Sequence, residues 1–287
     1  MTPQAETARP TPEERVRALA ERLQPYHLRY EAARDPRAVF AFVYYNVTVD
    51  LAERLAAPDH GFADPGWVAD LGVAFGRRFL AAMDALDEHL AGRLAAGEVP
   101  RPWLDVHEAI RDGRSYVLED LVFSMMAHIS FDLPHAVLDL PAGGERLADY
   151  HRMNSVLADK MEFIQEQVAE RYQRWLGKLD RLAGSFDEFL TNYGIRGARS
   201  VAYYNSQRLL EASSAEAARG SIERSTRAFI ESVRRPSPPW LAFGIRVLRW
   251  IVPRRRRWPE PPPEPPEAAP PAASRWQEPS EPGEPRG

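Results

Sequence analysis

The chain has 287 residues, of which 44% are hydrophobic, and its formal net charge at pH 7 is −4. A chain without net positive charge gives no reason to expect nucleic-acid binding, because phosphate-binding surfaces are basic. The absence of cysteine excludes disulfides, thiolate metal ligands and a cysteine nucleophile, and it fits a reducing compartment.

The first half of the chain reads as a series of helices. Residues 1–11 are expected to be disordered, and Thr11, Pro12 and Glu14 then form a helix-start signature of cap, first-turn proline and capping-box glutamate. The dipeptides Asp35-Pro36 and Asp64-Pro65 predict two further helix starts. The segment from Val39 to Leu55 is apolar on nearly every side, which is typical of a helix in the middle of a bundle.

Helical spacing continues through the second half. We expect helices over residues 103–110, 116–133, 147–175, 185–194 and 196–233. No period-two alternation flanked by turn residues is present, and this absence argues against strands. The sequence therefore predicts an all-α fold, a helical bundle of about six to seven helices spanning residues 12–235.

The composition changes after this domain. Residues 236–258 are apolar and basic, and residues 259–287 form a Pro/Glu-rich tail that is expected to be disordered. Trp240–Val252 is too short to span a bilayer, but as an amphipathic helix it could lie in the interface of an anionic membrane. Arg254–Arg257 would add attraction to such a surface, so Trp240–Trp258 is the predicted membrane contact. The alternative is that the segment folds back over an apolar groove of the bundle.

No signal peptide is recognisable, and no stretch reaches the roughly eighteen apolar residues that cross a bilayer. We therefore expect a cytoplasmic protein, either free or peripheral to the inner face of the membrane.

A polar row interrupts the apolar helix over residues 116–133. Asp120, Ser124, His128 and Asp132 are spaced four apart and therefore share one helix face. One interpretation is a metal or acid–base site, in which His128 and Asp132 bind a divalent ion, zinc above all, with His135 and Asp149 as weaker ligand candidates. The other interpretation, which we favour, is a buried hydrogen-bond ladder.

Two further polar residues belong to the candidate pocket. Asn154 occupies an apolar seam position, where it either fixes the register of packing or faces the His128 row. Tyr45 belongs to a polar cluster in the central helix that either satisfies core hydrogen bonds or lines a pocket; the other members are Tyr44, Asn46, Thr48 and Asp50.

The segment from Ala127 to Leu133, Ala-His-Ile-Ser-Phe-Asp-Leu, resembles the hallmark of an uncharacterised bacterial family. In that domain of unknown function the segment reads Ala-His-Ile-Asn-x-Asp-Leu, and the likeness extends from residue 37 to about residue 210. It implies an all-helical fold and no particular activity. The Ala-His-x-x-x-Asp pattern is also similar to zinc-dependent phospholipase C and related single-strand nucleases, which implies zinc ligation by His128 and Asp132. The second such pair of that family is missing, because Ser155 follows four residues after His151.

Two functions are therefore expected. The favoured one is a non-catalytic module that binds a protein partner, a lipid or a membrane surface, because catalytic zinc needs three protein ligands and only two are well signalled. The alternative is a metal-dependent hydrolase for a phosphoester or lipid substrate, with Asp120, His135, Asp149 or Asn154 completing the shell around His128 and Asp132.

Overall fold

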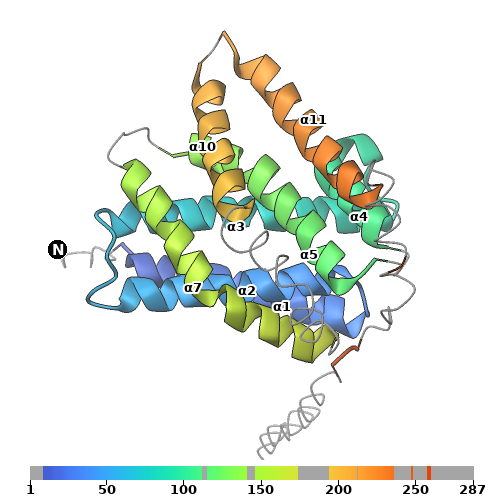
Figure 1. The fold of residues 1–287 in the computed structure, drawn as a ribbon, viewed down its shortest axis with the longest axis horizontal. Coiled ribbons are helices and arrows are strands. Elements are labelled where there is room, and N and C mark those ends of the chain that lie inside the picture. Colours follow the sequence, from blue (N-terminus) through green and yellow to red (C-terminus); the bar gives the residue numbers. More distant parts are fainter. Residues whose placement is uncertain are drawn as a thin grey trace, which may run out of the picture.

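The computed structural model describes residues 9–111, 115–140, 146–173, 194–211, 213–235, 247 and 257–259, with the backbone alone over 157–165. These residues contain nine α-helices, one 3-10 turn and one π-helix, and no strand occurs among them (Figure 1). The predicted all-α bundle is confirmed, with a slightly larger number of helices than expected.

Three long helices build one side of the bundle. Helix α1 (Pro12–Ala32) packs along α2 (Arg37–Ala56) and against α3 (Pro65–Leu90) (Figure 1). The predicted caps are present: Thr11 and Glu14 form a capping box, and Asp64 accepts a hydrogen bond from the backbone N–H of Trp67 at 2.8 Å.

Glycine allows α1 and α3 to approach closely. A Cβ atom placed on Gly76 of α3 would lie 2.5 Å from Cδ1 of Leu19 on α1. Leu19 is buried with Val16 and Leu23 on the same face of α1. The contact between these two helices therefore depends on the missing side chain at Gly76.

The central polypeptide run is helical for longer than expected. Helices α4 (Arg101–Ile110) and α5 (Val117–Met126) are followed by a π-helix, η2 (Ala127–Asp132), and directly by α6 (Leu133–Leu138). We predicted that this helix would end at Leu133, before Pro134, and this was wrong. Pro134 lies in the first turn after the π-helix, where the hydrogen-bond register changes and a missing N–H is tolerated.

The run Val117–Leu138 is long and apolar enough to cross a membrane by length and composition alone. This corrects the expectation that no stretch of the chain reaches that size. Its most apolar window is 67% buried inside the bundle, as in a core helix.

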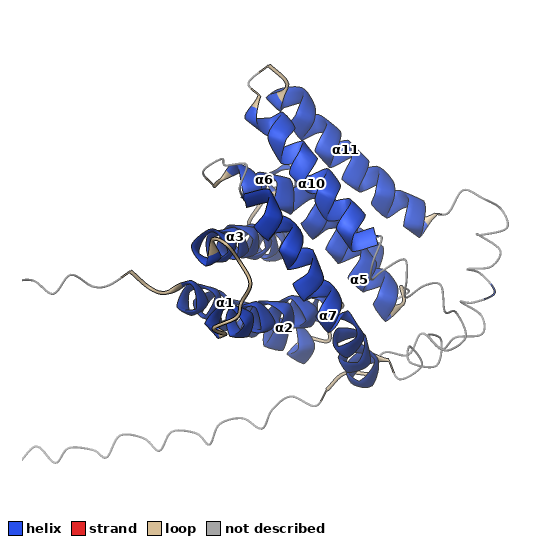
Figure 2. Cartoon of the chain, turned by 60° about the vertical axis from the view of Figure 1, so that its left-hand side comes forward, coloured by secondary structure: helices blue, strands red, loops and turns tan. Residues whose placement is uncertain are grey.

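The last long helix was predicted as one element over residues 196–233, and it is two. After α7 (Arg146–Tyr172), helices α10 (Ile195–Leu210) and α11 (Ala215–Arg234) form a hairpin. The hairpin packs on η2, and its tip points away from the rest of the bundle (Figures 1 and 2). The Ser214 hydroxyl donates to the backbone carbonyl of Arg208 at 2.8 Å. This serine therefore competes with the backbone for the hydrogen bonds that would have continued the helix.

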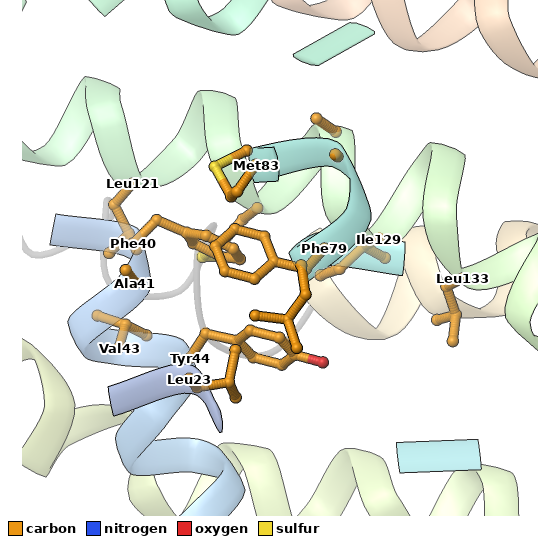
Figure 3. Close-up of a cluster of buried hydrophobic side chains, with 14 of the residues drawn as sticks. Leu23, Phe40, Ala41, Val43, Tyr44, Phe79, Met83, Leu121, Ile129 and Leu133 are labelled. Atoms are coloured by element: carbon orange, nitrogen blue, oxygen red, sulfur yellow. The ribbon is translucent and has the colours of Figure 1, made fainter. Parts of the chain in front are cut away.

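The hydrophobic core lies where α2, α3 and the α5–η2 run meet. Figure 3 shows Phe40 and Tyr44 of α2 packed with Phe79 and Met83 of α3 and with residues of the third run, Leu121, Ile129 and Leu133. All are buried.

Several predictions concern residues that the structure does not describe. These are the disorder of the first eight residues and of the tail from residue 260, most of the 185–194 helix, and most of segment 236–258. The described Trp258 packs edge-to-face on Tyr172, with ring centroids 6.1 Å apart. Membrane contact through Trp240–Trp258 stays a prediction.

Candidate functional site

His128 lies at the centre of the bundle, enclosed by aromatic rings. It sits on the π-helix η2, and only 2% of its surface is exposed. Its imidazole stacks on Phe75 with ring centroids 3.6 Å apart, and Tyr44 approaches edge-on at 4.5 Å. π-Helices are rare and frequently occur at functional sites, so this location is notable in itself.

One carboxylate oxygen orients the imidazole. Nδ1 of His128 lies 2.9 Å from Oδ2 of Asp132, and the indole Nε1–H of Trp103 donates to the same oxygen at 3.0 Å. Donation from Nδ1–H to the carboxylate leaves Nε2 as the unprotonated acceptor of a neutral ring. Burial lowers the pKa of His128, with Asp132 opposing and Arg199 reinforcing that effect. The ring is therefore neutral near pH 7, and its buried Nε2 has no hydrogen-bond partner.

Tyr44 connects this group electrostatically to Arg199. Burial raises the pKa of the Tyr44 hydroxyl, the Asp132 carboxylate raises it further, and the Arg199 guanidinium opposes the rise. The hydroxyl is therefore protonated at any physiological pH. The hydroxyl interacts electrostatically with both the Asp132 carboxylate and the Arg199 guanidinium.

Arg199 is the second unusual group of the site. It is carried by α10, is 2% exposed, and has its guanidinium carbon 4.8 Å from the centre of the Tyr150 ring. Its Nε donates to Oδ1 of Asn154 at 2.5 Å, while its Nη2 has no hydrogen-bond partner. Within the described part of the chain no acid forms an ion pair with it, and burial lowers its pKa.

The predicted row along the helix divides into separate contacts. Asp120 accepts a hydrogen bond from the Ser115 hydroxyl at 2.5 Å, near the start of α5. Ser124 lines a narrow cavity of about 10 Å³, together with Trp103, other apolar residues, Arg37 and His107. His128 and Asp132 do contact each other, as the spacing predicts, but the π-helix changes the turn geometry on which a continuous row depends.

The proposed metal ligands do not converge. His135 places Nδ1 2.8 Å from the carbonyl oxygen of Phe131. Asp149 accepts from the backbone N–H groups of Ala63 and Asp64, at 2.9 and 2.7 Å, and so fixes the loop before α3. Among the residues that the structure describes, no group of three His, Asp or Glu side chains is arranged to hold a metal ion.

Asn154 and Tyr45 contact other partners than expected. Asn154 is buried, as its seam position predicts, but its partner is Arg199 rather than the His128 row. Tyr45 is half-buried and stacks on His27, with ring centroids 6.3 Å apart. Its neighbour Tyr44 takes the position beside His128.

A surface hollow of about 540 Å³ lies between α2 and α7. Its walls include Arg54 and Asp50 of α2 and the exposed side chains of His151 and Arg152 on α7. Asn154 connects the hollow with the buried site, because its Nδ2 lies 3.5 Å from Nδ1 of His151 while its Oδ1 accepts from Arg199.

The sequence prediction missed Arg199. The signal was its spacing with the buried residues Ala202, Ser206 and Leu209, which places an arginine on the inward face of α10. An arginine in that position is unusual, since arginine is almost never fully buried unless it is paired.

A model of a protein family described as "Family of unknown function (DUF5995)" matches residues 16–236. No curated protein and no solved structure matches the chain.

Proposed function

The chain belongs to this family of unknown function, and we propose that it is a non-catalytic helical module that binds a small molecule at the polar centre of its bundle. One observation carries the proposal: Nε2 of His128 and Nη2 of Arg199 are buried without hydrogen-bond partners. Leaving such a group unsatisfied costs about 1–3 kcal/mol, and more for a charged one. Helical bundles place ligands among side chains that project from facing helices.

Two other buried charged groups among the described residues, Arg37 and Glu31, are ion-paired, which makes the unpaired charge of Arg199 informative. Arg37 is ion-paired with Asp35 and Asp87, both at 2.6 Å. Burial alone would raise the pKa of Glu31, but hydrogen bonds from Arg171, His27 and Tyr172 outweigh it and lower that pKa to about 2. A buried charge with a purely structural role is commonly paired in this way.

The geometry favours binding over metal-dependent hydrolysis. A catalytic zinc site uses three protein ligands and keeps one position open. The described residues bring together His128 and Asp132 alone, and Oδ2 of Asp132 already accepts from Trp103. Phe75 stacks on the imidazole and Tyr44 contacts it edge-on, so the ring has an apolar, aromatic environment.

Native mass spectrometry of untagged protein tests this proposal. We expect a mass excess of one small molecule per chain that disappears on denaturation, and a smaller bound fraction in Arg199→Met. Elemental analysis of the same sample measures bound metal and so tests the alternative of a metal-dependent hydrolase. Stoichiometric zinc would overturn the non-catalytic proposal. Ligand binding would be overturned if the native mass equalled that of the polypeptide alone and no compound of a broad thermal-shift panel stabilised the protein.

A further inference from the structure

We infer that the bound molecule carries a compact oxyanion, a carboxylate or a phosphate, that pairs with Arg199 and enters through the hollow between α2 and α7. This inference rests on the proposed function and specifies its ligand. Two features support it: the charge of Arg199, which no described acid neutralises, and the hollow, which Asn154 links to Arg199.

The charge of Arg199 is not neutralised by any acid among the described residues. A buried cation is stable when a carboxylate or another anion pairs with it, and costly otherwise. Two arginines are buried among the described residues, and Arg37 follows the rule by pairing with Asp35 and Asp87. Arg199 departs from it, since its side-chain hydrogen bond goes to the neutral amide of Asn154.

The nearby acids are engaged elsewhere. Asp132 interacts with His128 and Trp103, and Asp149 binds two backbone N–H groups before α3. Neither carboxylate could pair with Arg199 without breaking these hydrogen bonds. Among the described residues no acid is left to pair with Arg199, so in this proposal the bound molecule supplies the missing anion.

The N–H donor of Arg199 that lacks a partner determines which ligand chemistry fits. A guanidinium presents a planar fork of N–H groups that matches the two oxygens of a carboxylate or phosphate. Nε of Arg199 is occupied by Asn154, and Nη2 is the donor without a partner. An oxyanion fits this donor, whereas a neutral apolar ligand would leave both the charge and the N–H unsatisfied.

The hollow between α2 and α7 offers the ligand a route toward Arg199. The hollow of about 540 Å³ has a size that suits a small molecule. Two arginines, Arg54 and Arg152, line it against one acid, Asp50, so its walls attract an anion. Asn154 links a residue of the hollow to Arg199, because its Nδ2 lies 3.5 Å from Nδ1 of His151 and its Oδ1 accepts from the guanidinium. The proposed route therefore runs from the hollow past Asn154 to the guanidinium of Arg199.

The inference is tested by thermal unfolding of the full chain in sodium phosphate and in sodium acetate, each against sodium chloride at equal ionic strength. We expect a saturable rise of the unfolding midpoint with at least one oxyanion, and the two arms distinguish phosphate from carboxylate. Arg199→Met should weaken the apparent affinity by about tenfold or more, the loss of one charge-assisted pair. Arg199→Lys, which keeps the charge and loses the fork, should give an intermediate affinity.

Arg196→Met is the matched control, because Arg196 is an exposed residue of the same helix, and it should respond like the unsubstituted chain. The double variant Arg54→Gln/Arg152→Gln should weaken binding several-fold, with a reduced dependence on salt. Equal responses of the Arg199 and Arg196 variants would overturn the inference, since the anions would then act at the surface.

Failure of the inference is distinguishable from failure of the proposed function. If native mass spectrometry finds a bound neutral molecule and neither oxyanion stabilises the chain, the oxyanion assignment is wrong and ligand binding stands. If no molecule of any kind is bound, both are wrong.

Discussion

The guanidinium of Arg199 donates its Nε–H to the amide oxygen of Asn154 at 2.5 Å, so a fully buried cation is held by a neutral group. Arg37, the second buried arginine among the described residues, is held by two carboxylates. This difference gives the two residues opposite expected effects on stability.

Replacing Arg199 with methionine should stabilise the protein in buffer free of oxyanions. Removing an unpaired buried charge gains more than is lost at Asn154, and we expect the free energy of unfolding to rise by about 1–2 kcal/mol. Residues kept for binding commonly reduce stability in this way. Urea denaturation measures the change.

Arg37→Met is the matched control for this experiment. It leaves Asp35 and Asp87 without their cation, and we expect a loss of roughly 3 kcal/mol. If Arg199→Met destabilised the chain as strongly as Arg37→Met, Arg199 would be a structural residue and its binding role would be contradicted.

The stability of the protein should depend on pH through His128. Burial lowers its pKa from the ordinary value of 6.5, so below pH 6.5 the unfolded chain binds a proton that the folded chain refuses. Stability is therefore fully present above pH 6.5 and falls as the pH decreases through that value, by up to about 1.4 kcal/mol per pH unit for each such histidine.

Burial lowers the pKa of His107 and His135 in the same direction, so His128 supplies one of three contributions. Denaturant titrations between pH 5 and 8 should show a shallower slope for His128→Gln than for the unsubstituted chain. An unchanged slope in His128→Gln would mean that the imidazole is accessible to protons in the folded state.

The α1–α3 contact should be sensitive to a single methyl group. Gly76→Ala places a Cβ 2.5 Å from Leu19, and overpacking of this kind costs about 1–3 kcal/mol, which exceeds the gain of up to about 1 kcal/mol in helix propensity. We expect a lower melting temperature by circular dichroism. Gly197→Ala on α10 meets no atom within 4 Å and should instead stabilise by about 0.5–1 kcal/mol. Equal stabilisation by both would show that α1 and α3 are not in close contact.

The sequence predicts helix starts well, because they depend on local chemistry. Thr11 and Asp64 cap the helices that their patterns indicate, and His128 contacts Asp132 as a four-residue spacing requires. Local signals were less informative where two structures compete. The π-helix leaves no pattern in the sequence, and the serines near residue 214 are compatible with a helix interior until tertiary packing is known.

The composition of the site depends on long-range contacts that periodicity does not give. Tyr44 and Tyr45 are adjacent, and a rotation of about 100° per residue decides which one faces His128. Arg199 is far from His128 in the chain, so their common burial follows only from the packing of α10 against η2 and α6. The metal hypothesis relied on residues that lie close together in the sequence. In the fold His128 and Asp132 do contact each other, but His135 and Asp149 have other partners.

The most direct test of the polar centre is a high-resolution crystal structure of the full chain grown in phosphate or acetate, compared with one grown in chloride alone. We expect density larger than a water molecule within hydrogen-bond distance of Nη2 of Arg199, present in the oxyanion crystals and absent from Arg199→Met. A single ordered water that satisfies Nη2 in every condition, or a protein carboxylate packed against it, would contradict the account.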